Sequence, residues 1–291
     1  MNFANVKAIT IPEGNVNQIT DGNGVVLWKK NTGPDYTEPF YVENDTGSSI
    51  TVKVLRNNNL APTITAQYSY NKVNWYNVDL TTGLSVAKNT KVYFRATSSR
   101  NGSWCSQYTN YFAYFSGLTK VGGNIMSLVY GSNFTGQETT FPGSFTYNFN
   151  SLFMNNKSLT DAENLLLPAT TLTTGCYSQM FKGCTYLTKV PELPATTLVN
   201  QCYQQMFYGC SYLTKAPELP ATTLVANCYG SMFYNCSRLN YIKCLATNPN
   251  SSYSSGWMYG TASSGTFVKA SSASWSRNES GIKSGWTVQS V

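Results

Sequence analysis

The sequence contains no histidine, which excludes catalytic sites that depend on an imidazole. Serine and cysteine nucleophiles usually rely on a histidine base, so catalytic triads of that kind are ruled out. Charged residues are also scarce, at 11% of the chain, against about 25% in an average globular protein. Solubility must therefore come mainly from Ser, Thr, Asn and Tyr.

Long apolar runs and clusters of like charge are missing as well. Nowhere do 18 apolar residues follow one another, so no membrane-spanning helix is expected. The net charge of +7 has no concentrated source, because Lys29 and Lys30 form the only adjacent basic pair. No nucleic-acid surface is therefore predicted. Residues 1–7 lack the apolar stretch of a signal peptide, which favours a protein that is not exported through one.

A unit of 26 residues is written three times between residues 167 and 244. The motif Leu-Pro-Ala-Thr-Thr-Leu begins at Leu167, Leu193 and Leu219, and each copy continues with Cys-Tyr-x-x-Met-Phe-x-x-Cys-x-x-Leu. A fixed period of this length predicts repeats that stack on one another as a solenoid. The predicted structural core consists of the recurring residues Cys176, Met180, Phe181, Cys184, Cys202, Met206, Phe207, Cys210, Cys228, Met232, Phe233 and Cys236.

The spacing within each copy predicts one helix and one strand. Offsets of 0, 4, 8 and 11 from the first cysteine lie on one face of a helix of 3.6 residues per turn. The segment 187–191 that follows is extended in character, and Pro191 and Pro194 forbid helix there. The predicted fold class is therefore a capped α/β leucine-rich repeat solenoid, preceded by an all-β N-terminal region.

Both ends of the repeats are predicted to be capped. Leu152, Phe153 and Leu159 reproduce part of the repeat spacing, so residues 132–166 are expected to hold an entry cap with a degenerate copy. After residue 246 the period stops, and the segment 247–291 is rich in Ser and Gly. We expect this segment to cover the far end of the core with its large apolar residues, Trp257, Phe267, Trp275 and Trp286.

The first half reads as two β units. Residues 1–33 predict a small β attachment element, with a strand at 6–11, a turn at 21–24 and a second strand at 25–28. Residues 34–131 predict an Ig-like antiparallel β-sandwich, since 50–55, 64–70 and 92–96 alternate in polarity. Trp75 is expected in its core.

The repeat signature, together with the endings 265–269 and 285–288, resembles BspA-like leucine-rich repeat proteins of gut Bacteroidales and their phages. The resemblance implies adhesion or recognition at a cell or virion surface, with no catalytic residues and no cofactor. It also implies a homo-oligomer, a trimer by analogy with fibres, attached to other virion proteins through the N-terminal region.

The eight cysteines raise the question of disulfides and metals. Seven fall at or beside repeat positions, and the prediction is two ladders of reduced, buried thiols. A zinc site is rejected, because the two cysteines of one copy are eight residues apart and no histidine is present. Cys105 as a nucleophile would lack an activating base.

The alternative prediction of an enzyme rests on one pair of carboxylates. Glu192 and Glu218 occupy equal positions in adjacent copies, where stacking would place them about 5 Å apart, a separation typical of retaining glycosidases. Both belong to a repeated Pro-Glu-Leu-Pro motif, so their spacing follows from the repeat itself. Hydrolysis of a capsular glycan therefore stays the remote alternative, and the chain is predicted not to be an enzyme.

The predicted function is noncatalytic recognition or architecture at a surface. A phage virion component, such as a tail or head fibre or decoration protein that contacts a gut bacterial surface glycan or protein, is preferred; an exported bacterial adhesin is the alternative. Positions on the side of the predicted helices, Lys182, Tyr208 and Tyr234, change between copies, as exposed residues do. The candidate binding residues lie on the strand side: Thr188, Lys189, Thr214, Lys215, Asn240, Tyr241 and Lys243.

Overall fold

The computed structural model describes residues 18–20, 26–29, 34–56, 66–97, 113–143 and 145–291. The chain divides into two compact units, Met1–Asp35 and Tyr36–Val291. In the first unit, β1 (Gln18–Thr20) pairs antiparallel with β2 (Val26–Lys29). The strand predicted at 6–11 and the turn predicted at 21–24 lie outside the described residues.

The second unit begins with two sheets that face each other. The larger sheet has six strands in the order β11-β10-β3-β8-β5-β6, and the smaller has the order β7-β4-β9. Rings from both sheets meet between them: Phe115 lies 5.4 Å from Phe40 and 5.8 Å from Phe94, measured between ring centroids. The strands are β3 (Tyr41–Asn44), β4 (Ile50–Arg56), β5 (Ala66–Ser69), β6 (Tyr76–Val78), β7 (Leu84–Val86), β8 (Thr90–Ala96), β9 (Ala113–Ser116), β10 (Lys120–Asn124) and β11 (Asp161–Leu166).

Trp75 does not lie in this core. Its indole is half-buried, and the guanidinium carbon of Arg95 lies 4.2 Å from the ring centroid. The expectation of a core tryptophan is therefore wrong, because the ring is used as a platform for a cation on the outer face of the sheet.

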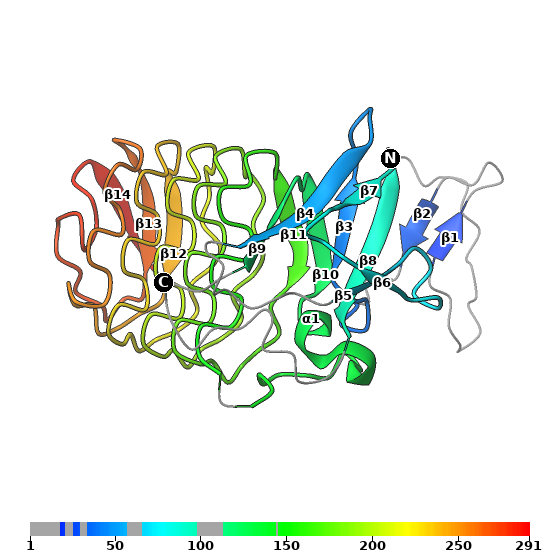
Figure 1. Ribbon diagram of the computed structural model, residues 1–291. Coiled ribbons are helices and arrows are strands. Elements are labelled where there is room, and N and C mark those ends of the chain that lie inside the picture. Colours follow the sequence, from blue (N-terminus) through cyan, green and yellow to red (C-terminus); the bar gives the residue numbers. More distant parts are fainter. Residues whose placement is uncertain (1–17, 21–25, 30–33, 57–65, 98–112, 144) are drawn as a thin grey trace, which may run out of the picture. The chain divides into compact units, whose positions relative to one another are not determined.

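The junction between the sheets and the repeats is built by β10 and β11. All other pairs in the six-stranded sheet are antiparallel, whereas β10 and β11 run parallel and are joined by α1 (Ser127–Tyr130) and the 3-10 turn η2 (Gly131–Asn133). Ser127 fixes α1 to the sheet, because its Oγ accepts from the N–H of Phe40 and donates to the carbonyl of Phe94. The sheet thus continues into the first turns of the stack (Figure 1).

The predicted α/β leucine-rich repeat solenoid is wrong. Strands account for 27% of the described residues and helices for 3%, and no helix forms in any of the three copies. The segments 176–183, 202–209 and 228–235, which were expected to be helical, are chains of hydrogen-bonded turns. Successive copies lie side by side as coils of turns (Figure 1); we call this arrangement, residues 145–261, the repeat stack.

Left-handed residues explain why no helix forms. A residue with positive φ recurs every fourth position, as at Gly175 (65°), Gln179 (59°) and Gly183 (74°). A residue with positive φ cannot be part of a right-handed α-helix, so the helical conformation is interrupted after every three residues. Residues that carry a side chain adopt positive φ only as single residues, which is the pattern seen here. The same positions are left-handed in the neighbouring copies, at Tyr147, Ser151, Asn155, Gln201, Gln205, Gly209, Asn227, Ser231, Asn235, Gly256 and Gly260.

Backbone N–H groups in these segments alternate between two kinds of acceptor. One N–H closes a turn within its own copy, as Met180 donates to the carbonyl of Tyr177 at 3.3 Å. The next N–H reaches the following copy, as Phe181 donates to the carbonyl of Met206 at 2.9 Å. Half of the donors therefore hold a copy together and half join it to its neighbour, so the backbone is satisfied without a helix.

The strand expected at 187–191 is also absent. On this side of the stack, between β11 and β12 (Tyr241–Cys244), the β-pairing of the copies consists of isolated parallel bridges, such as Asp161 with Lys189 and Lys215 with Tyr241. Pro191 and Pro194 lack the N–H that a continuous ladder requires, which limits pairing at this side.

Columns of buried side chains fill the repeat stack. Phe181 lies 5.5 Å from Phe207, and Phe207 lies 5.9 Å from Phe233, with nearly parallel rings. The thiol of Cys184 donates to the carbonyl of Phe153 at 3.0 Å, and Cys210 and Cys236 repeat this contact with Phe181 and Phe207. The twelve residues expected in the core have no exposed surface.

The two ends of the stack are closed by aromatic residues. At the entry, the ring of Phe153 stacks on Phe181 at 5.2 Å. At the exit, Trp257 stacks on Tyr229 at 6.0 Å and on Trp275 at 5.3 Å. A parallel sheet of β12, β13 (Gly265–Lys269) and β14 (Trp286–Ser290) follows the last copy. Within the described residues, no helix is long and apolar enough to cross a membrane.

Candidate functional site

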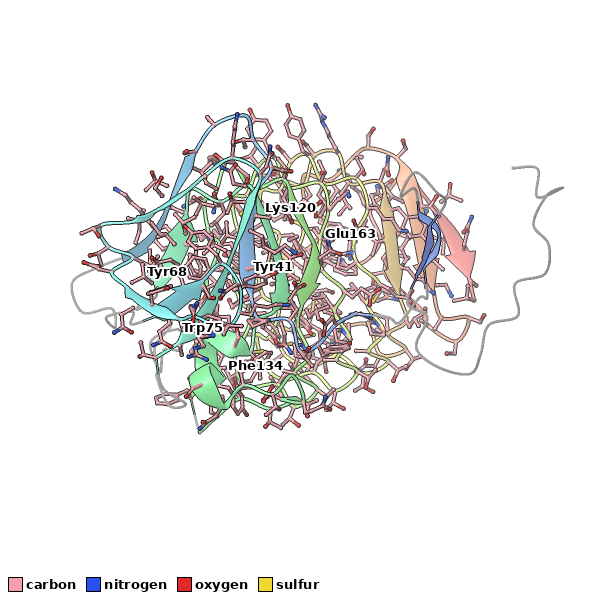
Figure 2. The ribbon with its side chains drawn as sticks, turned by 90° about the vertical axis from the view of Figure 1, so that its right-hand side faces the viewer. Tyr41, Tyr68, Trp75, Lys120, Phe134 and Glu163 are labelled. Atoms are coloured by element: carbon pink, nitrogen blue, oxygen red, sulfur yellow. The ribbon has the colours of Figure 1, made fainter. Side chains whose placement is uncertain are left out.

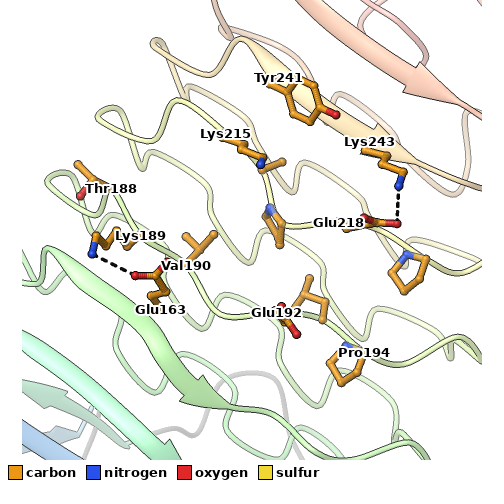
Figure 3. Close-up of a pocket in the computed structure, with 14 residues that line it drawn as sticks. Glu163, Thr188, Lys189, Val190, Glu192, Pro194, Lys215, Glu218, Tyr241 and Lys243 are labelled. Atoms are coloured by element: carbon orange, nitrogen blue, oxygen red, sulfur yellow. Dashed lines mark hydrogen bonds and ion pairs between the residues drawn. The ribbon is translucent and has the colours of Figure 1, made fainter. Parts of the chain in front are cut away.

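A groove of about 640 Å³ lies on the strand side of the repeat stack (Figure 3). Its walls come from β11, from the two extended segments 188–194 and 215–220, and from β12. We call this surface the strand-face groove. It is lined by Glu163, Thr188, Lys189, Val190, Glu192, Leu193, Pro194, Lys215, Ala216, Pro217, Glu218, Pro220, Tyr241 and Lys243.

The Pro-Glu-Leu-Pro motif places the carboxylates in the groove. In an extended segment successive side chains point to opposite sides, and Leu193 is 3% exposed whereas Glu192 and Pro194 are exposed. Glu218 and the fully buried Leu219 repeat this alternation in the next copy. The leucines thus anchor the segments in the core, and the glutamates are left facing the groove.

Two of the three lysines in the groove are already neutralised. The Nζ atom of Lys189 lies 3.0 Å from Glu163 and 3.5 Å from Asp161. Its hydrogen bond to Glu163 and the negative charge of Asp161 raise the pKa of Lys189. Lys243 forms an ion pair with Glu218 at 2.9 Å (Figure 3).

The middle of the groove keeps one cation and one anion without an ion pair. Among the described residues, neither Lys215 nor Glu192 has an oppositely charged group within 4.0 Å. Lys215 instead lies over the ring of Tyr241, with its Nζ 5.4 Å from the ring centroid. Both side chains are exposed, so a ligand can reach the two charges.

The structure gathers five of the seven predicted binding residues in this groove: Thr188, Lys189, Lys215, Tyr241 and Lys243. Thr214 and Asn240 are exposed but lie outside it, and the N–H of Asn240 donates to the carbonyl of Thr214. Glu163 was not predicted from the sequence, and Glu192 and Glu218 were predicted only as candidate catalytic groups. The repeated Pro-Glu-Leu-Pro motif is the signal that could have placed these two glutamates opposite the lysines.

A row of alternating charges extends from the groove across the sheet. Lys189 is in register with Asp161, Asp161 with Lys120, Lys120 with Glu43, and Glu43 with Lys91. Figure 2 shows Lys120 and Glu163 on this side of the sheet, near Tyr41. Opposite charges on neighbouring strands attract each other, so the row helps to fix the repeat stack to the sheet.

Beyond this row, a cation–π contact between Lys91 and Tyr41 covers part of the outer face of the sheet. The Nζ atom of Lys91 lies 3.8 Å from the ring centroid of Tyr41, which is 3% exposed. Burial, followed by the charge of Glu38, raises the pKa of Tyr93 to about 12. The hydroxyl of Tyr93 donates to Glu38, so the ring is a fixed part of the sheet surface.

The geometry offers little to catalysis. Glu192 is exposed, and Glu218 is exposed and paired with Lys243, so neither carboxylate lies in the desolvated setting that a general acid requires. Burial raises the pKa of the thiols of Cys176 and Cys184 to about 12, which keeps them protonated and inert. Cys105 lies outside the described residues, and the described part of the chain holds no cluster of His, Cys, Asp and Glu suited to a metal ion.

Neither family models, nor curated proteins, nor solved structures gave a match to the chain.

Proposed function

We propose that the chain is a noncatalytic recognition protein that binds a partner molecule in the strand-face groove. The observation that carries this proposal is the pair of charges left without an ion pair, Lys215 and Glu192, between lysines that are already neutralised. A ligand that brings an anionic group to Lys215 and a cationic group or hydrogen-bond donor to Glu192 fits this arrangement.

The composition of the groove favours a polar partner over an apolar one. Three lysines and three glutamates alternate around a floor of Val190, Leu193 and Ala216. Such a lining selects ligands by the positions of their charged groups. A ligand whose charges are placed differently would meet a like charge, or would lose hydration without gaining a partner.

We also propose that the partner belongs to a bacterial surface and that the chain is carried on a phage particle. The support for this part is the resemblance of the repeat signature to BspA-like proteins of gut Bacteroidales and their phages. An exported bacterial adhesin would use the same groove, and the genes beside the coding sequence distinguish the two origins.

The test is binding of the fluorescently labelled chain to gut Bacteroidales cells, with and without their capsules. The double variant Lys215→Gln with Glu192→Gln removes both unpaired charges and leaves the net charge unchanged. Its matched control is Lys88→Gln with Glu279→Gln, two exposed residues outside the groove. We expect strain-selective binding that falls at least tenfold in the groove variant and is unchanged in the control.

Two results would overturn the proposal. Equal binding by the two double variants would show that the groove does not recognise the cells, and binding to no strain would leave the protein without the proposed partner. Release of reducing sugar from capsular polysaccharide by the wild-type chain, lost in Glu218→Gln, would establish hydrolysis in place of simple binding.

A further inference from the structure

A column of tyrosines runs along the outside of the repeat stack, on the corners formed by the turn segments. Tyr208 stacks on Tyr234 with ring centroids 4.7 Å apart and an interplanar angle of 4°, and Tyr234 stacks on Tyr259 at 4.7 Å and 21°. The Nζ atom of Lys182 occupies the equivalent position in the first copy, 5.1 Å from the ring centroid of Tyr208. The column is thus headed by a cation.

A second column occupies the next outward corner of each copy, four residues further along. Tyr186 packs on Tyr212 with ring centroids 4.8 Å apart. The guanidinium carbon of Arg238 lies 3.9 Å from the ring centroid of Tyr212 and ends this column. Tyr186 and Tyr259 are each 49% exposed. The two columns together make a surface that we call the turn face.

The turn face carries positive charge and no negative charge. The segments 172–187, 198–213 and 224–239 contain no Asp and no Glu, whereas they contain Lys182 and Arg238. The carboxylates of the repeat region, Asp161, Glu163, Glu192 and Glu218, all belong to the strand side. The opposite surfaces of one stack therefore differ in charge character.

The stacking of the rings determines which ligands this face can take. Each ring covers the face of its neighbour, so the edges and the hydroxyl groups of the tyrosines point outward. Ring edges carry partial positive charge and hydroxyl groups donate hydrogen bonds, which suits oxygen atoms of an anionic ligand. Side-chain amides add to this surface, since Lys182 already donates to Gln205 at 2.8 Å and to Gln179 at 3.3 Å.

We propose that the turn face binds an anionic polysaccharide, a chain of carboxylated sugars that lies along the columns. Hydroxyl donors that recur at every copy match a polymer whose hydroxyl and carboxylate groups also recur. Recognition of single-stranded nucleic acid would need open ring faces for stacking of successive bases, and here Tyr234 is covered on its two faces by Tyr208 and Tyr259. This site lies on other residues than the strand-face groove and is independent of it.

The experiment measures binding of the full chain to polygalacturonate, with neutral dextran as the uncharged probe. The variant Lys182→Gln with Arg238→Gln removes two positive charges from the turn face. The matched control is Lys53→Gln with Lys88→Gln, which removes two exposed positive charges that lie outside both the turn face and the strand-face groove. A third variant, Tyr208→Phe with Tyr234→Phe and Tyr259→Phe, removes only the hydroxyl groups.

We expect polygalacturonate to bind and dextran not to bind. The Kd should rise at least tenfold in the turn-face charge variant, at least threefold in the hydroxyl variant, and less than twofold in the control variant. If both charge variants lost the same affinity for polygalacturonate, the effect would depend only on net charge, and the proposal would be overturned. The absence of any binding would also overturn it. Equally tight binding of polyglutamate or of oligo-dT would overturn the assignment to a polysaccharide. Thermal unfolding of each variant shows that the stack is intact.

Discussion

Lys189 is in register with Asp161, and the two side chains approach to 3.5 Å across the boundary between the first full repeat and β11. Asp161 is at the same time in register with Lys120 on β10. Asp161 therefore lies between a lysine of the sheet and a lysine of the first full repeat, and it is in register with both.

Removal of the Asp161 carboxylate tests this arrangement. Asp161→Asn should lower the melting temperature at low ionic strength by a small amount, because the pair is partly exposed. The difference from wild type should disappear at about 1 M salt, where the screening length is only about 3 Å. Asp45→Asn, an exposed carboxylate without an ion pair among the described residues, is the control. A difference that persists at high salt would show that Asp161 acts by packing.

The phenylalanine column should dominate the stability of the stack. Phe207 is fully buried between Phe181 and Phe233, so Phe207→Ala should lower the free energy of unfolding by about 3–5 kcal/mol through lost transfer energy and the cavity left behind. Tyr186→Ala truncates an aromatic ring that is 49% exposed and should cost about 1 kcal/mol or less. Chemical denaturation measures both values, and equal losses would contradict the role of the column.

Left-handed positions can be tested with a matched set of substitutions. Gly209 has a φ of 75° and its added Cβ would meet no atom closer than 3.8 Å, so Gly209→Ala should cost about 1–2 kcal/mol from backbone strain alone. Gly183→Ala should cost more, because its Cβ would also collide with the amide of Asn155. Gln205, with a φ of 55°, should gain stability when changed to Gly. Stabilisation by Gly209→Ala would contradict the left-handed assignment.

Alkaline pH should weaken the fold through the buried thiols. Burial raises the pKa of Cys236 and Cys244 to about 12, from an ordinary value of 9.0. Between these values the unfolded chain binds fewer protons than the folded chain, so the free energy of unfolding falls as pH rises from 9 to 12.

Each such thiol contributes a slope of about 1.4 kcal/mol per pH unit in this window. Cys236→Ala should therefore lose stability less steeply with pH than the wild type, by about that amount, although it is less stable at neutral pH. Denaturation curves at a series of pH values measure the two slopes, and identical slopes would show that Cys236 already ionises in the folded state.

The spacing of the repeat identifies the recurring positions, and these are the buried ones, but it does not determine the conformation. Offsets of 0, 4 and 8 fit one face of a helix and equally fit a chain of turns in which every fourth residue is left-handed. The deciding signal lies in single residues that precede the second cysteine, Gly183, Gly209 and Asn235. Glycine and asparagine adopt positive φ at low cost, whereas glycine inside a helix costs about 1 kcal/mol.

The groove could be predicted only in part, for a different reason. Two lysines on the strand side follow from the sequence, because Lys189 and Lys215 recur at the same position of the first and second copies. Which charges neutralise one another depends on the register of adjacent copies: Lys243 meets Glu218 of the preceding copy, whereas Lys189 meets residues of β11. Only when these ion pairs are known can Glu192 and Lys215 be identified as the charged residues of the groove that have no ion pair among the described residues.

The alternation of backbone hydrogen bonds has a consequence for how this chain can change over generations. Each copy presents the same row of acceptors to the copy before it and the same row of donors to the copy after it. An in-frame gain or loss of one 26-residue unit therefore leaves matching surfaces at the new junction. The distance between the sheet and the exit tryptophans can thus lengthen or shorten in whole steps, while both ends and the register of every remaining copy are preserved.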